Sequence, residues 1–180
     1  MAERSFPCRG GPAAVDLVNT TIVERGRPHD LLASERDLAA WLAFERDRLD
    51  LETISTEISL ADFHALREAL RQTFTAAVRG RRPPAGALEA INRASLREPV
   101  APQLDWSAAR APRLSAEAAD PLAAVARSAI ELLARPSRER LRACANPVCV
   151  LFFVADNRRR LYCSESCGNR VRVARHAARR

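Results

Sequence analysis

The chain has 180 residues, enough for one ordinary domain and a small module or for a single larger domain, and it can bury a core without disulfides. Its 29 basic residues, all arginine, outnumber its 22 acidic residues and give a net charge of +7. No run approaches about 18 uninterrupted apolar residues, and the N-terminus lacks the apolar core of a secretory signal. The composition therefore excludes a membrane-spanning protein and predicts a cytoplasmic one with reduced thiols, associated with the nucleoid if it binds DNA.

The positive charge is concentrated in the C-terminal part of the chain. Residues 138–180 hold 11 arginines and three acidic residues, a net charge of +8, whereas residues 1–137 have a net charge of −1. This asymmetry is typical of a protein that binds a polyanion with one end. We therefore divide the chain into a mainly helical domain at 1–137, which has its own core, and a basic module at 138–180.

The first half of the helical domain carries two helix-start patterns. An apolar run at residues 13–23 precedes them and does not decide between helix and strand. Ser34 followed by Asp37 resembles an N-cap with an acidic residue three positions later, ahead of apolar residues at helical spacing. Ser59 repeats this pattern before a helix that Gly80 ends.

The second half of this domain is predicted to contain two more helices and little strand. A short helical run at residues 86–96 is followed by a proline-punctuated segment at 99–112, which predicts a short hairpin. Asp120 and Pro121 fit the N-cap and first position of a last helix, and Pro136 ends it. The domain boundary falls beside this proline.

Four of the five cysteines lie within 24 positions near the end of the chain: Cys144, Cys149, Cys163 and Cys167. They form two close pairs separated by a 13-residue insert. Each pair can bring two thiolates to one ion, and the insert is long enough to fold back and present the second pair to the first. This spacing predicts one Zn²⁺ per chain with four cysteine ligands; a redox-active or metal-free cluster and another soft metal are the alternatives.

The residues around the cysteines predict a small treble-clef-like zinc finger, a β-hairpin plus a helix. The β-prone run at 150–154 and the apolar pair at 161–162 are expected to form the hairpin, with a polar turn between them. Ser164 fits the N-cap of a helix that places Cys163 and Cys167 on one face. Because so few apolar side chains surround these residues, the metal is expected to supply much of the folding free energy.

The predicted DNA-binding residues are the arginines of this last helix: Arg170, Arg172, Arg175 and Arg179. The last three recur three and four positions apart on one face, which suits contact with phosphates. In the alternative interpretation they only offset the negative charge of the zinc site or favour the helix C-terminus electrostatically.

Two residues beside the last ligand deserve a separate prediction. Glycine costs about 1 kcal/mol in a helix interior, so we expect another backbone or a phosphate to approach Gly168 closely. Asn169 either braces the metal site or hydrogen-bonds to a base or phosphate, and the structural role is the favoured one.

The stretch CANPVCVLFFVADNRRRLYCSESCGNRVRVARHAARR, which begins at Cys144, resembles the CGNR-type zinc finger, named for Cys167, Gly168, Asn169 and Arg170. Upstream, AVDLVNT at 14–20 and DLLASERDLAAWL at 30–42 resemble the ABATE-like N-terminal domain of bacterial stress-induced transcription regulators. The resemblance covers nearly the whole chain. It implies a zinc-binding, DNA-binding regulator whose four cysteines are the ligands.

Asn19 and Thr20 end the AVDLVNT motif and are a possible ligand pocket, an expectation that rests mainly on the resemblance. The alternative is that they cap a helix or satisfy buried backbone groups.

The predicted function is thus a stress-responsive transcription regulator that binds double-stranded DNA through its finger. Its helical domain is expected to bind a small-molecule effector or to form a homodimer, without touching DNA. The alternative is a zinc-stabilised module that binds an acidic protein partner. A zinc enzyme needs an open coordination position, which four thiolates close, so we expect no enzymatic activity.

Overall fold

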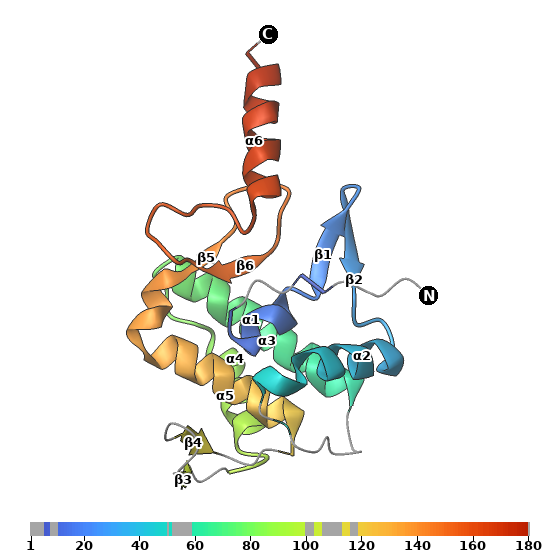
Figure 1. Ribbon diagram of the computed structural model, residues 1–180, viewed down its shortest axis with the longest axis vertical. Coiled ribbons are helices and arrows are strands. Elements are labelled where there is room, and N and C mark those ends of the chain that lie inside the picture. The colour runs from blue at the N-terminus through green and yellow to red at the C-terminus, as the bar shows by residue number, and fades with distance from the viewer. Residues whose placement is uncertain are drawn as a thin grey trace.

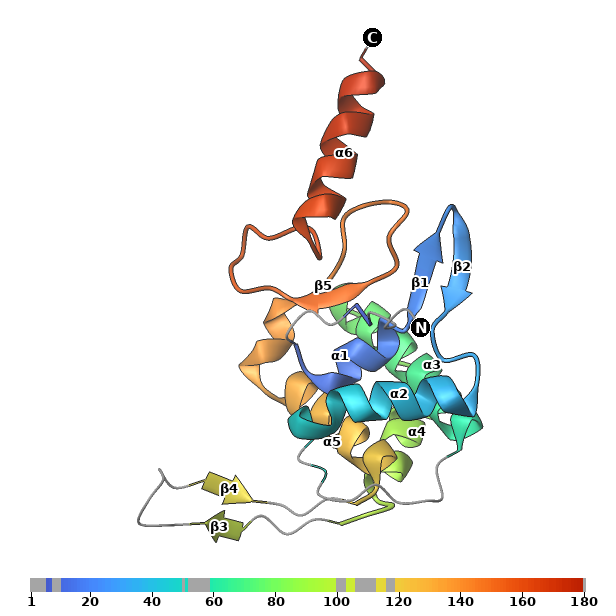
Figure 2. The same ribbon diagram turned by 45° about the vertical axis from the view of Figure 1, so that its right-hand side comes forward.

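The computed structural model describes residues 6–7, 11–49, 51, 59–99, 103–105, 113–115 and 119–179. Within these ranges the body contains α1 (Ala13–Val18), α2 (Glu35–Glu45), α3 (Leu60–Val78), α4 (Ala85–Ser95) and α5 (Pro121–Ala134). The last helix, α6 (Glu165–Ala177), projects away from the body (Figures 1 and 2). The predicted mainly helical fold is confirmed. None of the helices in the described ranges is long and apolar enough to cross a bilayer.

The strands of the described residues form three antiparallel hairpins. They pair β1 (Thr21–Glu24) with β2 (Arg27–Asp30), β3 (Gln103–Asp105) with β4 (Arg113–Ser115), and β5 (Leu141–Ala143) with β6 (Phe152–Val154). Short 3₁₀ turns follow α2, at Arg46–Arg48, and precede β5, at Pro136–Arg140.

The predicted helix starts are confirmed by their cap contacts. The hydroxyls of Ser34 and Ser59 each accept a hydrogen bond from the backbone N–H three residues later, at 3.3 Å. The carboxylate of Asp120 accepts two backbone N–H groups of the first turn of α5, at 2.9 and 3.0 Å. Gly80, with φ of +63°, follows the end of α3 as predicted. These contacts satisfy N–H groups that the first turn of a helix leaves without partners.

The undecided run at 13–23 divides into α1 and β1, and the sequence analysis missed the hairpin that β1 begins. Arg25 and Gly26 form its two-residue turn, with φ of +48° and +78°. Positive φ at both central positions suits the twist of a tight hairpin, and a glycine at the second position is the signal that was available.

The predicted hairpin at 99–112 is present but longer. Leu104 lies opposite Leu114, so the second strand begins beyond the predicted segment. Trp106, which falls within the predicted segment, lies outside the described residues.

The predicted pairing of the strand at 150–154 is wrong. We expected residues 161–162 to pair with 150–154, whereas β6 pairs with β5, with Leu141 opposite Val154. Leu161 is 55% exposed, so it gives β6 no apolar cover; its carbonyl accepts a single backbone hydrogen bond from Ala145, at 2.9 Å. The two faces of β6 are covered by other residues. Phe152 packs into the body core and Phe153 packs against the cysteines, while β5 pairs along the edge of the strand.

The core of the body extends into the hairpin β5–β6. Large side chains that are almost fully buried, including Trp41, Phe63 and Phe74, form the body core together with Leu141 and Phe152 of the hairpin. The rings of Phe74 and Phe152 lie 5.8 Å apart, nearly edge to face. The predicted division into 1–137 and 138–180 stays a prediction, and these two segments share a core.

Candidate metal centre

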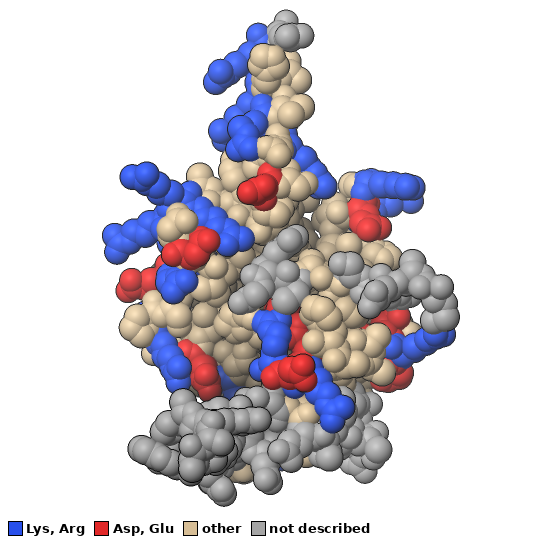
Figure 3. Space-filling model, in the orientation of Figure 1, with Lys and Arg blue, Asp and Glu red and all other residues tan. Residues whose placement is uncertain are grey.

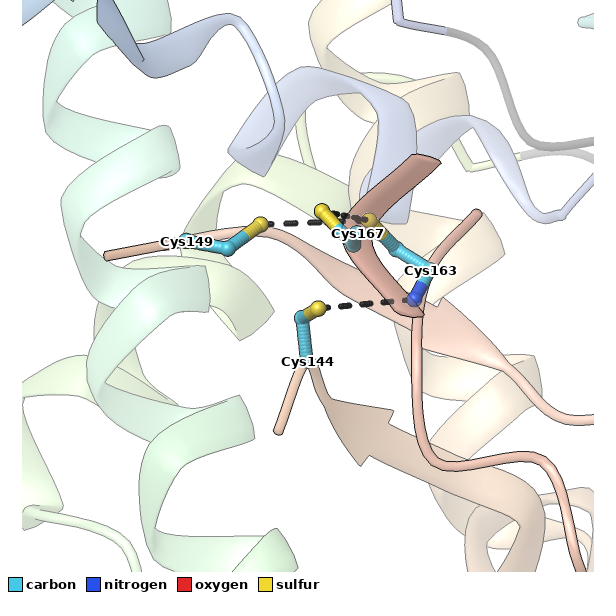
Figure 4. Close-up of side chains that lie close together, drawn as sticks. All are labelled: Cys144, Cys149, Cys163 and Cys167. Atoms are coloured by element: carbon cyan, nitrogen blue, oxygen red, sulfur yellow. Dashed lines mark hydrogen bonds between the residues drawn. The ribbon is translucent and has the colours of Figure 1, made fainter. Parts of the chain in front are cut away.

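The four cysteines come from separate positions in the finger, and their side chains meet at one point. Cys144 directly follows β5, Cys149 lies in the turn before β6, Cys163 precedes α6, and Cys167 lies in its first turn. All four sulfur atoms lie within 4.8 Å of one another and point toward a common centre (Figure 4). Cys163 Sγ lies 3.8 Å from Cys149 Sγ and 3.6 Å from Cys167 Sγ.

These separations fit a tetrahedral zinc site. Sulfur atoms about 2.3 Å from a zinc ion at tetrahedral angles lie about 3.8 Å apart. Three of the cysteines are buried and Cys149 is half-buried. Four thiolates would fill every position around the ion and leave none for a substrate, which is the arrangement of structural zinc sites.

Backbone turns hold the ligands in place. Cys149 N donates a hydrogen bond of 2.9 Å to Asn146 O, which closes the turn between the first two ligands. Cys163 N points at Cys144 Sγ at 3.5 Å and so links the two pairs. The backbone N–H of Cys167 donates to the Ser164 hydroxyl at 3.3 Å, so the predicted cap of α6 also orients the last ligand.

The thiols depend on one another for ionisation. The hydrogen bond from Cys149 lowers the pKa of Cys163 to about 5, and the same bond raises the pKa of Cys149. Burial raises the pKa of Cys144. One thiolate can therefore be stabilised by neighbouring thiols, whereas four thiolates this close together need a cation.

Arg160 supports the site in a way that the sequence analysis missed. Its guanidinium donates to Cys163 O at 2.9 Å and to Tyr162 O at 3.3 Å, and it lies 5.0 Å from the centre of the Phe153 ring. These contacts hold the backbone at Tyr162 and Cys163 in place and so orient the third zinc ligand. No local pattern separates Arg160 from Arg158 and Arg159, which precede it.

Gly168 and Asn169 act through their neighbours. A Cβ atom at Gly168 would lie 3.2 Å from Tyr162 Cδ2 and 3.5 Å from Arg172 Nη1, so a ring and a guanidinium approach it closely, rather than another backbone. The approach of a phosphate stays a prediction. Asn169 Oδ1 accepts a hydrogen bond from Arg172 Nη2. Asn169 thus has a structural contact, but its partner is Arg172 and not a residue of the metal site.

The body holds the finger through Asn19. Its side-chain amide donates to Phe152 O and accepts from Phe152 N, both at 2.9 Å, and the side chain has no exposed surface. Asn19 therefore pairs with β6 as a residue of a neighbouring strand would. On the other side of β6, Phe153 belongs to the cysteine cluster, against which Ile22 of β1 also packs.

The hydroxyl of Thr20 is also buried and hydrogen-bonded, to groups within the body. Its hydroxyl donates to Leu17 O at 2.7 Å and accepts from Arg67 at 2.9 Å, and it is fully buried. A cavity of about 420 Å³ lies instead between α5 and β6, with Arg127 and Val154 in its lining. The ligand pocket at Asn19 and Thr20 stays a prediction, and their contacts are those of the structural alternative.

Three of the predicted DNA-binding arginines, Arg170, Arg172 and Arg175, lie on α6, and Arg179 lies two residues beyond its end. Arg170, Arg172, Arg175 and Arg179 are exposed, and only Cys167, Gly168 and Val171 of α6 are buried. The helix carries its arginines away from the body (Figure 3).

A buried acidic pair lies elsewhere in the body. Asp16 and Glu45 are both buried, and Arg48 Nη1 lies 2.5 Å from Asp16 Oδ2 and 3.0 Å from Glu45 Oε2. Burial, with the nearby charge of Asp16 as a smaller cause, raises the pKa of Glu45 to about 7. A raised pKa means that the fold favours the protonated carboxyl.

Stability is therefore expected to fall as the pH rises from about 4.5 to 7 through this group. The contribution of Glu45 is complete below its unfolded pKa and is lost above its folded one, a difference of about 3 kcal/mol. Denaturant unfolding at a series of pH values measures it. Glu45→Gln should remove the fall, so that the variant is more stable than wild type at pH 8, whereas Asp47→Asn, at an exposed site, should leave the profile unchanged. Parallel pH profiles for wild type and Glu45→Gln would contradict this prediction.

Comparison with known families agrees with the geometry. Residues 11–136 match the ABATE family, described as "Putative stress-induced transcription regulator", and residues 140–180 match the CGNR zinc finger. No curated protein matches the chain. The finger match and the four-sulfur cluster together confirm the predicted cofactor, one Zn²⁺. The chain therefore belongs to the ABATE family, and its ABATE domain is followed by a CGNR zinc finger.

Proposed function

We propose that this regulator binds duplex DNA and that α6 is the element that enters the major groove. The observation that carries the proposal is that α6 projects from the molecule with its arginines exposed, while zinc ligands hold its first turn (Figures 1 and 3). A helix of 13 residues is about 20 Å long, and the major groove admits an α-helix. The body is proposed to carry the regulatory part, an effector site or a dimer surface.

The arginines at the far end of α6 argue against simple compensation of the zinc site. Arg175 lies eight residues beyond Cys167, about 12 Å along the helix axis, and Arg179 follows just after α6 ends, farther still from the zinc ligands. Both distances exceed the Debye length of about 8 Å at physiological salt, so the zinc charge is largely screened there. Exposed guanidinium groups at this distance suit phosphate contacts.

Replacing both far arginines with glutamine is expected to weaken duplex binding and its dependence on salt. Each lost phosphate contact removes about 0.9 from the log–log slope, so Arg175→Gln with Arg179→Gln should flatten it by about 1.8. The affinity at about 0.1 M salt should fall on the order of 50-fold. Fluorescence anisotropy with a labelled random-sequence duplex over a range of KCl concentrations measures both quantities.

A matched control carries the same change of charge elsewhere. Arg36 on α2 and Arg93 on α4 are exposed and lie on helices away from α6 (Figure 1). The double variant Arg36→Gln with Arg93→Gln should bind nearly as wild type does. If the two double variants bind DNA with the same affinity, α6 is not the contact element. If the protein is retained on polyglutamate but has no affinity for DNA, its partner is an acidic protein.

A further inference from the structure

The loop between β6 and Cys163 forms a hollow with the start of α6. This hollow has a volume of about 730 Å³ and is open to solvent. Its lining includes three arginines, one tyrosine and two residues of the CGNR segment: Arg159, Arg160, Arg172, Tyr162, Gly168 and Asn169. The loop thus places arginines beside those of α6.

Two arginines of the loop have no partner for their charge within the described part of the chain. Arg158 and Arg159 are exposed, and among the residues that the structure describes their guanidinium groups make no hydrogen bond or ion pair. The turn that presents them is ordered, because Asn157 Oδ1 accepts the backbone N–H of Arg159 at 3.0 Å. Arg160 differs, since it contacts Cys163 O and pairs with Asp156 at 3.5 Å. The loop therefore supplies two available cations, Arg159 in the lining of the hollow and Arg158 beside it in the chain, outside that lining.

On the opposite wall, α6 supplies a third cation in a fixed position. Asn169 accepts a hydrogen bond from Arg172, and the absence of a side chain at Gly168 leaves room for that guanidinium to lie back over the helix. The acidic groups at this hollow are Asp156, already paired with Arg160, and Glu165, in the first turn of α6. The positive charges of the loop and helix therefore outnumber the acidic ones.

We infer that this hollow holds the backbone phosphates of the DNA whose major groove α6 enters, with Arg158 and Arg159 as a second contact element and Asn169 as the positioning residue of Arg172. This inference rests on the proposed function. A helix in the major groove is flanked by the sugar–phosphate strands, so a basic loop beside it meets one of them. Basic side chains gather along α6 and over the loop at its base, on one side of the molecule (Figure 3). This continuity favours DNA over an acidic peptide.

The test uses the full-length zinc-loaded protein and the same random-sequence duplex. Arg158→Gln with Arg159→Gln should flatten the salt slope by about 1.8 and lower the affinity on the order of 50-fold. Zinc content and the far-UV spectrum should stay at wild-type values, because neither guanidinium contacts the metal site. The Arg36 and Arg93 double variant is the matched control.

The outcomes separate this inference from the proposed function. If the Arg175 and Arg179 variant weakens DNA binding but the loop variant matches the control, the inference is wrong and the proposed function stands. If wild type shows no salt-dependent duplex binding, both are wrong. If the loop variant keeps its DNA affinity but loses retention on polyglutamate, the loop binds an acidic protein.

A double-mutant cycle tests the positioning role of Asn169. Asn169→Ala should lower the duplex affinity when Arg172 is present and should cause no further loss in an Arg172→Gln background. Equal losses in the two backgrounds would overturn the positioning role, because they would mean that Asn169 acts independently of Arg172.

Discussion

Removal of zinc is expected to destabilise the body as well as the finger. The hairpin β5–β6 is held on one side by the cysteine cluster and on the other by the body core, to which Leu141 and Phe152 contribute. A structural zinc ion contributes on the order of 10 kcal/mol to the folding of a small finger, so its loss should free the hairpin. Phe152 would then leave the body core exposed. This revises the sequence expectation that residues 1–137 stand alone.

Trp41 makes the effect measurable because it is fully buried in the body, on α2. Chelation, or Cys163→Ser, should lower the midpoint of thermal unfolding followed by tryptophan fluorescence, by at least about 10 °C. Cys8→Ser, at the cysteine outside the two pairs, should change neither the midpoint nor the zinc content of one ion per chain. An unchanged tryptophan transition in zinc-free protein would show two independent units.

Truncation of Asn19 is expected to produce the second large effect. Asn19→Ala removes two hydrogen bonds and leaves the buried N–H and C=O of Phe152 without partners. Each buried unsatisfied group costs about 1–3 kcal/mol, so the loss of partners for two groups should lower the unfolding free energy by about 2–6 kcal/mol. Urea unfolding at constant zinc concentration measures it.

Asn92→Ala is the matched control, because Asn92 is exposed on α4 and the change should cost less than about 0.5 kcal/mol. If Asn19→Ala costs no more than this control, the contacts with β6 do not hold the finger on the body.

Those parts of the fold that depend on neighbouring residues were predictable from the sequence. The hydroxyls of Ser34 and Ser59 accept hydrogen bonds from N–H groups three positions later, so a short stretch of sequence is enough to predict where each helix begins. The zinc ligands were predictable for a similar reason, since each cysteine pair lies on one turn or at one helix start.

The parts that were missed depend on contacts between distant segments. Asn19 and Phe152 are 133 positions apart, and nothing beside Asn19 indicates that its amide pairs with a strand. The strand β5 has only three residues, too few for an apolar alternation to show. Arg160 looked like part of a solvated basic run because its partners, Cys163 O and the Phe153 ring, become close only when the loop folds.

The alternation along β6 limits how this finger can be moved between proteins. Phe152 packs into the body and Phe153 packs against the cysteines, so a shift of one residue would exchange the two faces. A chimera that joins residues 138–180 to a foreign domain would leave Leu141 and Phe152 without their apolar cover. A unit that can be moved therefore has to include α1 with the Asn19 that follows it, and α3, because Asn19 and Phe74 contact Phe152 of β6. Recombination within this family should thus preserve the body and finger as a matched pair.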